Sequence, residues 1–377
     1  TTMRSRLRRL PLLLGLLVLA SCGKTKQDVF HPSGKTADKI NTLQIPVFIA
    51  AGVVGVIVAA LLIVVMVTGH RRASAGVDDP KQIHGNFIAE ITWTILPFII
   101  LVAVAIPTVV TILDISRTPK DAMHVKVYGQ QWWWSYEYDL NGDGTPEIVT
   151  ANELVLPVGQ DVQLDIQSRD VIHSFWIPEL AGTRDAVPGR VQTTQIRADK
   201  VGEYYGQCKE FCGLSHANMR AKAVVLSQAD FDKWLQDQQK PAATPASGTD
   251  AALGLATFSG KCASCHQIMG VNEVEGKAAL VAGHAPNLTH LMSRTVFASA
   301  QFDLYVPGPD GKLVFNRNQL EAWLRDPTTL LPMAADKQRG MPNLNLSETE
   351  IDDLIAYLST LGPYPADAAP PTSNGGK

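Results

Sequence analysis

Two long runs without a charged side chain constrain the fold of this chain more than any other feature. They cover residues 40–69 and 91–113, and both are rich in Val, Ile, Leu and Ala. About 20 such residues cross the hydrocarbon core of a bilayer as a helix. Pro97 and Pro107 lie inside the second run, where a membrane helix tolerates them. The sequence therefore predicts a two-helix transmembrane hairpin over residues 40–115.

The N-terminus has the layout of an export signal. Four arginines precede an apolar run over residues 10–20, which is the pattern of a secretory signal peptide. The run ends in Leu-Ala-Ser-Cys at residues 19–22, which resembles a bacterial lipobox, where the cysteine is lipidated and becomes the new N-terminus. We expect a signal peptide over residues 1–21 and lipidation at Cys22. A plain signal peptide with an incidental cysteine is the alternative.

The connection between the two apolar runs carries the basic residues Arg71, Arg72 and Lys81. Basic residues of short loops stay on the cytoplasmic side of the membrane. The N-terminus and everything after residue 115 are therefore expected outside the cytoplasm. This predicts a bacterial plasma-membrane protein with its water-facing domains on the outer face.

Beyond residue 120 the pattern changes to short strands, followed by a short helix over residues 228–239. The strands alternate or are rich in β-branched residues, with Gly and Pro between them, and they cover residues 125–128, 153–156, 162–166 and 192–196. Such spacing is typical of a β-sandwich or barrel. We therefore expect an all-β domain over residues 120–238.

The last third of the chain differs again in composition. Residues 239–251 are rich in Pro, Ala, Ser and Thr, which is typical of a flexible linker. From Ala252 the pattern is helical as far as Leu361, so an all-α domain is expected over residues 252–362. Residues 363–377 are rich in Pro, Ala and Gly, and we expect a disordered tail. The net charge of −3 gives no indication of nucleic-acid binding.

The most informative cluster of side chains is Cys-Lys-Glu-Phe-Cys-Gly-Leu-Ser-His-Ala-Asn-Met at residues 208–219. Two thiols, an imidazole and a thioether suit copper better than magnesium or calcium. Two cysteines four residues apart can bridge two metals and share one electron between them. A second imidazole is available at His173, at the end of an expected strand. Zinc and a disulfide are the alternatives, but zinc does not usually recruit Met, and a disulfide leaves the His and Met unexplained.

Residues 40–235 resemble subunit II of cytochrome c oxidase, from the membrane hairpin to a cupredoxin-like domain with a dinuclear copper centre, CuA. The resemblance implies a ligand set of two imidazoles, two bridging thiolates, a thioether and a backbone carbonyl, supplied by His173, His216, Cys208, Cys212, Met219 and Glu210. It also implies that the carboxylate of Glu210 holds a magnesium ion at the boundary with subunit I.

Three further positions match segments of this family. Trp132 opens an aromatic stretch, and the resemblance implies that electrons from an external cytochrome c enter at this residue. The alternative is that Trp132 lies in the hydrophobic core. A haem on the same chain would turn this docking contact into an intramolecular one. Asp185 matches a segment that faces water and haem propionates beneath the copper centre. Glu90 matches a glutamate at the mouth of a proton channel, with a solvated helix end as the alternative.

Cys262-Ala-Ser-Cys265-His266 is a C-x-x-C-H sequence, the attachment site of c-type haem. The two cysteines form thioether bonds, and His266 supplies one axial ligand. Met341 is the expected second ligand, because a Met-Pro before a final amphipathic helix, residues 348–361, resembles class I cytochrome c.

Three further points concern this haem domain. Met333 is the alternative to Met341 as the axial ligand. The resemblance to class I cytochrome c also implies that the carbonyl of Pro286 orients the ring of His266. Residues 297–315 exceed what a minimal cytochrome needs, and the sequence assigns them no function.

These features predict subunit II of a proton-pumping haem–copper oxidase with a fused cytochrome c, as in caa-type oxidases. Electrons would pass from cytochrome c or a quinol–cytochrome c reductase through haem c and CuA to subunit I, where oxygen is reduced. No residue of this chain is expected to be catalytic, and the expected partners are subunits I and III and the membrane. The alternatives are the CuA subunit of a nitric-oxide reductase, and a membrane-tethered electron carrier or copper-delivery protein.

Overall fold

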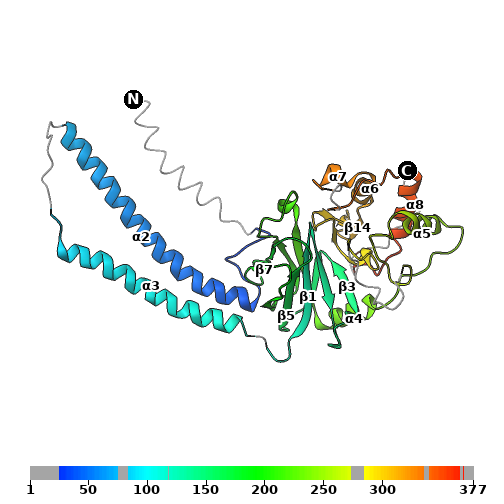
Figure 1. Ribbon diagram of the computed structural model, residues 1–377, viewed down its shortest axis with the longest axis horizontal. Coiled ribbons are helices and arrows are strands. Elements are labelled where there is room, and N and C mark those ends of the chain that lie inside the picture. The colour runs from blue at the N-terminus through cyan, green and yellow to red at the C-terminus, as the bar shows by residue number, and fades with distance from the viewer. Residues whose placement is uncertain are drawn as a thin grey trace.

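The computed structural model describes residues 25–74, 84–117, 119–272, 284–334, 339–365 and 368. The predicted signal peptide, the lipidation site at Cys22 and most of the predicted tail lie outside these residues. The described chain has three parts, and Figure 1 shows a pair of long helices and a helical C-terminal domain on opposite sides of a β domain.

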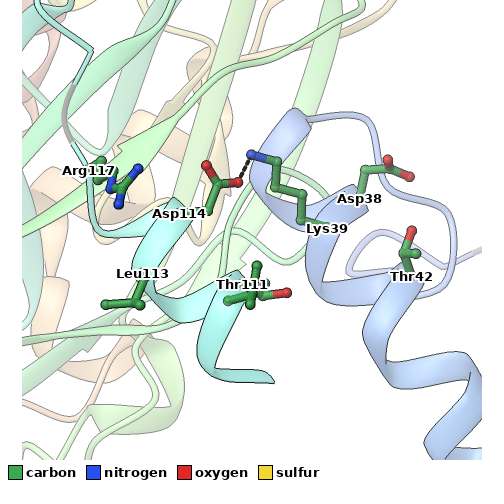
Figure 2. Close-up of a pocket in the computed structure, with 8 residues that line it drawn as sticks. Asp38, Lys39, Thr42, Thr111, Leu113, Asp114 and Arg117 are labelled. Carbon is green, nitrogen blue, oxygen red and sulfur yellow. Dashed lines mark hydrogen bonds and ion pairs between the residues drawn. The ribbon is translucent and has the colours of Figure 1, made fainter. Parts of the chain in front are cut away.

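The two apolar runs form α2 (Lys35–Ser74) and α3 (Phe87–Ile115). Both are long and apolar enough to cross a membrane, and their most apolar stretches are not buried inside the protein. Each helix extends beyond its uncharged run, α2 into residues 35–39 and 70–74 and α3 into residues 87–90 and 114–115. At the end next to the β domain, Lys39 of α2 forms an ion pair with Asp114 of α3 inside a polar pocket (Figure 2).

The segment before α2 fixes the membrane hairpin to the β domain. The Ser33 N–H donates to the Glu179 carbonyl at 2.8 Å, and the Asp199 N–H donates to the Ser33 carbonyl at 2.8 Å. The Lys35 N–H donates to the Arg197 carbonyl at 3.2 Å. These backbone hydrogen bonds set the direction in which the first membrane helix leaves the β domain.

The β domain is a sandwich of two main sheets. One sheet has the order β3-β2-β1-β5-β8, with β1 and β5 parallel and the other pairs antiparallel; its strands in chain order are β1 (Met123–Gln130), β2 (Trp133–Tyr138), β3 (Ile148–Ala151), β5 (Val162–Ser168) and β8 (Gln192–Ile196). The other sheet has the order β4-β10-β9, with β4 and β10 parallel, and consists of β4 (Glu153–Pro157), β9 (Gly202–Gln207) and β10 (Arg220–Leu226).

Two smaller elements complete this domain. A short pair, β6 (His173–Phe175) and β7 (Arg184–Ala186), lies at one end. Helix α4 (Gln228–Gln238) follows β10, where the sequence predicts a short helix.

The core of the sandwich is aromatic and continuous with the predicted copper ligands. Trp134, Tyr136 and Tyr138 of β2 are fully buried, and the same cluster of buried side chains includes Cys208, Cys212 and Met219. Along β1 the side chains of Val125 and Val127 point inward, which is the alternation expected of a strand with one buried face. The predicted ligands are therefore anchored in the hydrophobic core.

The C-terminal domain is helical, with two β-hairpins inserted. Its helices are α5 (Asp250–Lys261), α6 (Arg317–Arg325), α7 (Pro327–Leu330) and α8 (Glu348–Leu358). Helices α5 and α8 pack closely at Gly254, where a Cβ atom would overlap the carbonyl of Asp353. This close approach requires glycine.

The expectation of helix throughout residues 252–361 needs one correction. The stretch around residues 297–315, to which the sequence assigns no function, forms four short strands. They are β11 (Val296–Phe297), β12 (Phe302–Asp303), β13 (Tyr305–Pro307) and β14 (Leu313–Phe315). Their Val, Phe and Tyr content favours strands, but each is too short to show a period in the sequence.

Residues 239–249 contain no helix or strand, and the first of them contact the C-terminal domain. The Ala242 N–H donates to the Met269 carbonyl at 3.0 Å. At the end of α4, the Gln238 side-chain amide donates to the Ser293 hydroxyl at 3.0 Å. The start of the connection is therefore held against the C-terminal domain, while most of residues 243–250 are exposed.

Candidate copper and haem centres

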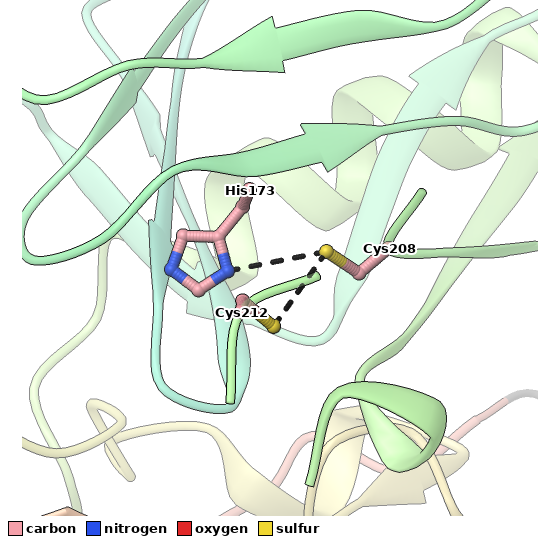
Figure 3. A group of neighbouring side chains, drawn as sticks. All are labelled: His173, Cys208 and Cys212. Atoms are coloured by element: carbon pink, nitrogen blue, oxygen red, sulfur yellow. Dashed lines mark hydrogen bonds between the residues drawn. The ribbon is translucent and has the colours of Figure 1, made fainter. Parts of the chain in front are cut away.

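The imidazole of His173 and the thiols of Cys208 and Cys212 face one another at one end of the sandwich (Figure 3). Cys208 Sγ lies 3.8 Å from Cys212 Sγ and 4.0 Å from His173 Nδ1. The ligand atoms of all three lie within 4.8 Å of one another, and all three residues are buried. Both cysteines are free, and their sulfurs lie well beyond the ~2.05 Å of an S–S bond, so the disulfide alternative is wrong for this structure.

The remaining predicted ligands complete the cluster. His216 Nδ1 lies 3.5 Å from Cys212 Sγ, and Met219 Sδ lies 3.8 Å from the same sulfur. The carbonyl oxygen of Glu210 lies 3.3 Å from Cys208 Sγ. The structure thus brings together every copper ligand that the sequence predicts. A buried thioether beside two thiols and two imidazoles is a donor set for copper rather than for structural zinc.

Strand ends place these donors. His173 begins β6, Cys208 follows the last residue of β9, and Met219 precedes the first residue of β10. The Cys208 N–H donates to the Met219 carbonyl at 2.8 Å, which closes the loop between β9 and β10. The Lys209 N–H donates to the Ser174 carbonyl at 2.9 Å, which joins this loop to β6.

Asp170 orients the His173 ring, a role that the sequence reasoning missed. Asp170 Oδ1 lies 2.8 Å from His173 Nε2, which directs Nδ1 towards Cys208. Burial alone raises the pKa of Asp170, but hydrogen bonds from His173 and from the Gln131 and Val171 N–H groups hold it below its usual value. Ligating histidines almost always have such a partner, so an Asp three residues before the histidine was a readable signal.

The contact between the two thiols shifts their pKa values in opposite directions. The hydrogen bond from Cys212 lowers the pKa of the Cys208 thiol to about 4, with a further contribution from His173 against the effect of burial. The same contact raises the pKa of Cys212, and burial adds to this. Both thiols can lose their protons only when a cation compensates the resulting charge. Two buried thiolates side by side fit a cationic metal centre.

Trp132 is buried beside the copper ligands rather than displayed to an external protein. Its side chain is 4% exposed, and its Nε1–H donates to the Cys212 carbonyl at 3.1 Å. Its neighbours contact the C-terminal domain, since the Gln130 amide donates to the His284 carbonyl at 3.2 Å and Arg339 Nε donates to Gln131 Oε1 at 2.9 Å. The aromatic stretch therefore contacts a domain of the same chain.

The haem-attachment residues form a compact turn at the end of α5. The His266 N–H donates to the Cys262 carbonyl at 2.9 Å, and His266 Nδ1 lies 2.8 Å from the Pro286 carbonyl, which is the partner the sequence predicts. Burial lowers the pKa of His266, so the ring is neutral at neutral pH. Hydrogen bonding at Nδ1 leaves Nε2 available as a ligand atom.

Asn272 holds this turn from the other side, and the sequence reasoning missed it. Its side-chain amide donates to the Ala263 carbonyl at 3.0 Å and to the His266 carbonyl at 2.8 Å. Its Oδ1 accepts the Ile268 N–H at 2.8 Å. No sequence signal marked this residue, because Asn six positions after a C-x-x-C-H motif is unremarkable in composition.

The two candidate methionines have different surroundings. Met341 is partly buried against the core of the C-terminal domain, whereas Met333 packs against the core of the β domain. The Met341 N–H donates to Met333 Sδ at 3.1 Å. Met333 thus supports the backbone of the Met341 loop, with its own sulfur already engaged by that N–H group.

The two carboxylates predicted at the boundary with subunit I lie far apart. Glu90 is exposed in the first turn of α3, where its carboxylate accepts the Asn86 N–H at 3.2 Å, and this end of the hairpin is remote from the β domain (Figure 1). Asp185 is exposed on β7, opposite Ser174 of β6 and so one residue from His173.

Comparison with known proteins agrees with all three parts of the chain. Residues 25–110 match the transmembrane domain of cytochrome c oxidase subunit II, residues 139–226 match its periplasmic domain, and residues 251–362 match cytochrome c. Cytochrome c oxidase subunit 2 of Alkalihalophilus pseudofirmus is 32% identical over 94% of this chain and 96% of that protein. The chain belongs to the cytochrome c oxidase subunit II family.

Two further similarities concern this subunit II. Cytochrome c oxidase subunit 2 of Bacillus subtilis is 32% identical over 94% of this chain and 97% of that protein. The crystal structure of the periplasmic domain of subunit II of cytochrome oxidase from Bradyrhizobium japonicum is 32% identical, with a TM-score of 0.30, and covers 33% of this chain and 97% of that domain. The chain is thus a subunit of an oxidoreductase complex, and its domains imply CuA copper and haem.

Proposed function

We infer that this subunit II receives electrons at the haem of its cytochrome c domain and passes them through CuA to the haem–copper centre of subunit I. Subunit I then reduces oxygen to water and couples this to proton pumping. The donor is an external cytochrome c or a quinol–cytochrome c reductase, and the chain itself performs electron transfer rather than bond chemistry.

One connection between the two redox domains carries this proposal. The hydroxyl of Ser215, next to the predicted ligand His216, donates to the carbonyl of Pro332. Pro332 is bonded to Met333, whose sulfur accepts the N–H of Met341, the predicted haem ligand. Two hydrogen bonds and a short covalent path thus join a haem ligand to a copper ligand. Ser215 is 2% exposed, so the contact excludes water.

The chain's own residues would hold both groups. The copper pair, when bound, supplies a one-electron centre held by His173, His216, the two thiolates of Cys208 and Cys212, Met219 and the Glu210 carbonyl. The haem would be held by thioether bonds from Cys262 and Cys265 and by His266 and Met341. Placement of Met341 against the core of its own domain supports it over Met333 as the ligand. Burial of both thiols and His173 keeps water from the copper ligands.

The boundary with subunit I includes the exposed part of the copper loop. Phe211 and Leu214 are 75% and 62% exposed, although they flank the buried ligand Cys212. Large apolar side chains left in solvent beside a redox site favour a protein partner. We place Glu210 and a magnesium ion at this boundary, with Asp185 on the neighbouring strand serving water and proton movement.

The remaining assignments concern the membrane. Arg71 and Arg72 lie at the same end of the hairpin as Glu90, which supports a cytoplasmic position for that end by the positive-inside tendency. Glu90 would then lie at the mouth of a proton channel in subunit I. Export by the signal peptide, lipidation of Cys22 and association with subunit III complete the proposal for a bacterial plasma-membrane oxidase.

Purification of the membrane complex through this chain tests the proposal. Oxygen and nitric-oxide consumption are measured with a reduced donor, together with optical and EPR spectra. We expect oxygen consumption, a haem c spectrum and a mixed-valence dicopper signal. Consumption of nitric oxide but not oxygen would assign the chain to a nitric-oxide reductase. A metal-loaded chain that purifies without a catalytic partner would indicate an electron carrier instead.

A further inference from the structure

The β11–β12 hairpin, residues 296–303, extends from the cytochrome c domain onto the copper domain. Its turn contains three consecutive residues other than glycine with positive φ: Ala298 at 44°, Ser299 at 64° and Ala300 at 54°. Such conformations persist only where the surrounding structure fixes them, and they gather at functional sites. The contacts of this turn therefore indicate what it does.

The tip of the hairpin holds the backbone on both sides of Met219. The carbonyl of Ser299 accepts the N–H of Arg220 at 3.1 Å. The side-chain amide of Gln301 donates to the carbonyl of Asn218 at 2.7 Å. Asn218 and Arg220 are the immediate neighbours of Met219, which is itself fully buried. The cytochrome domain thus supplies two of the hydrogen bonds that fix a predicted copper ligand.

The base of the hairpin is held by a buried charge pair of the copper domain. Glu153 Oε1 accepts the N–H groups of Thr295 at 2.8 Å and Val296 at 3.0 Å. The hydroxyl of Thr295 lies between the Glu153 carboxylate and the Lys222 ammonium group, bonded to both. Glu153 and Lys222 are only 3% and 2% exposed. Buried charges need such partners, so the pair ties the copper domain to the hairpin.

We propose that this hairpin is an interdomain brace that positions the Met219 side of the copper loop and fixes the haem domain against it. The proposal rests on the proposed function for the identification of Met219 as a copper ligand. It gives a role to the first part of the stretch, residues 297–315, by which this cytochrome domain exceeds a minimal one. Gln301 and Thr295 act as positioning residues, because they reach the copper loop only through Asn218 and the Glu153–Lys222 pair.

Hydrogen exchange of the full-length complex tests the brace. Gln301→Ala removes the tip contact, and Thr295→Val removes the hydroxyl at the base while keeping the side-chain size. We expect backbone exchange in peptides covering residues 216–226 to become about three- to tenfold faster in Gln301→Ala, as for the loss of one hydrogen bond. Thr295→Val should change exchange mainly around Lys222. The EPR signal of the copper pair should shift in Gln301→Ala.

Gln239→Ala is the matched control. Gln239 also donates its side-chain amide to a backbone carbonyl, that of Leu235 at 3.1 Å, but at the C-terminal end of helix α4, where Gln239 is the cap residue. This variant should leave residues 216–226 and the copper signal unchanged. Unchanged exchange in Gln301→Ala would overturn the brace, as would an equal increase over β1, β2 and β3. A complex without copper and haem signals would instead contradict the proposed function, since exchange reports the hairpin contact independently of either group.

Discussion

The copper loop and the haem-attachment turn are held in opposite ways. The copper loop, residues 208–219, is fixed by elements far away in the sequence, including β6, the Gln131 side chain and the β11–β12 hairpin. The haem-attachment turn is fixed by nearby residues, chiefly Pro286 and Asn272. The geometry of the copper loop therefore depends on the whole fold, whereas that of the haem-attachment turn is a local property of one domain.

Cys212→Ser gives the largest expected effect and would separate the two sites. Cys212 Sγ lies within 4 Å of Cys208 Sγ, His216 Nδ1 and Met219 Sδ, so its loss removes a sulfur that would hold the proposed copper pair. We expect the mixed-valence dicopper signal to disappear and oxygen consumption with a reduced donor to stop. Because haem attachment is local, the haem c spectrum should remain. Loss of the haem c spectrum together with the copper signal would show that haem attachment depends on the copper domain.

Gly340→Ala should disturb the methionine side of the haem site. Gly340 has a φ of 84°, and a Cβ atom there would lie 2.5 Å from Met333 Sδ. We expect about 1–3 kcal/mol less stability for the loop that carries Met341, measured by loss of the methionine-ligated ferric haem band during denaturant titration. Gly311→Ala is the control, because Gly311 has a φ of 79° with open space around it. If both variants lose the same stability, contact with Met333 does not support the loop that carries Met341.

Asn272→Ala tests whether the haem-attachment turn is fixed by residues of its own domain. It leaves the carbonyls of Ala263 and His266 without their side-chain donor. We expect the cytochrome domain to lose about 1–2 kcal/mol of stability, followed by haem absorption in denaturant. The copper EPR signal should not change, and a shift in it would show that the two sites are coupled through this turn.

The smallest expected effect is a pH dependence confined to the cytochrome domain. Hydrogen bonds with Lys261 and with Ser347 lower the pKa of Glu350 from 4.5 to about 2. A carboxyl whose pKa is lowered by folding contributes stability above pH 4.5, and this is lost as the pH falls towards 2. Because the Glu350 side chain remains about a third accessible to solvent, the contribution is small. The urea midpoint of the domain should fall less steeply with decreasing pH in Glu350→Gln; equal slopes would contradict this assignment.

The same contrast explains what could be predicted from the sequence. The membrane spans, the C-x-x-C-H turn and the Cys, His and Met of the copper loop are local patterns with a fixed chemical meaning. The contacts between domains leave no such pattern, because Gln301 and Asn218 are 83 residues apart and Glu153 and Thr295 are 142 apart. The β11–β12 hairpin was likewise hidden, since strands of two residues show no periodicity.

For Trp132, the family resemblance identified the residue, but its surroundings could not be predicted from the sequence. The sequence identified the aromatic stretch, yet its burial beside Cys212 and its contacts with the C-terminal domain follow from the domain arrangement. The burial of Trp132 supports the proposed electron path, in which an external donor reaches the cytochrome c domain first.

The proposed electron path requires the haem domain to be fixed against the copper loop and to pass electrons directly to it. The most direct test is the rate of electron transfer from haem c to CuA in the complete oxidase after photoreduction, measured at increasing viscosity and salt. A fixed contact predicts a rate that is unchanged by either. A rate that falls in proportion to viscosity would show that the haem domain must move to reach the copper, and would contradict the account.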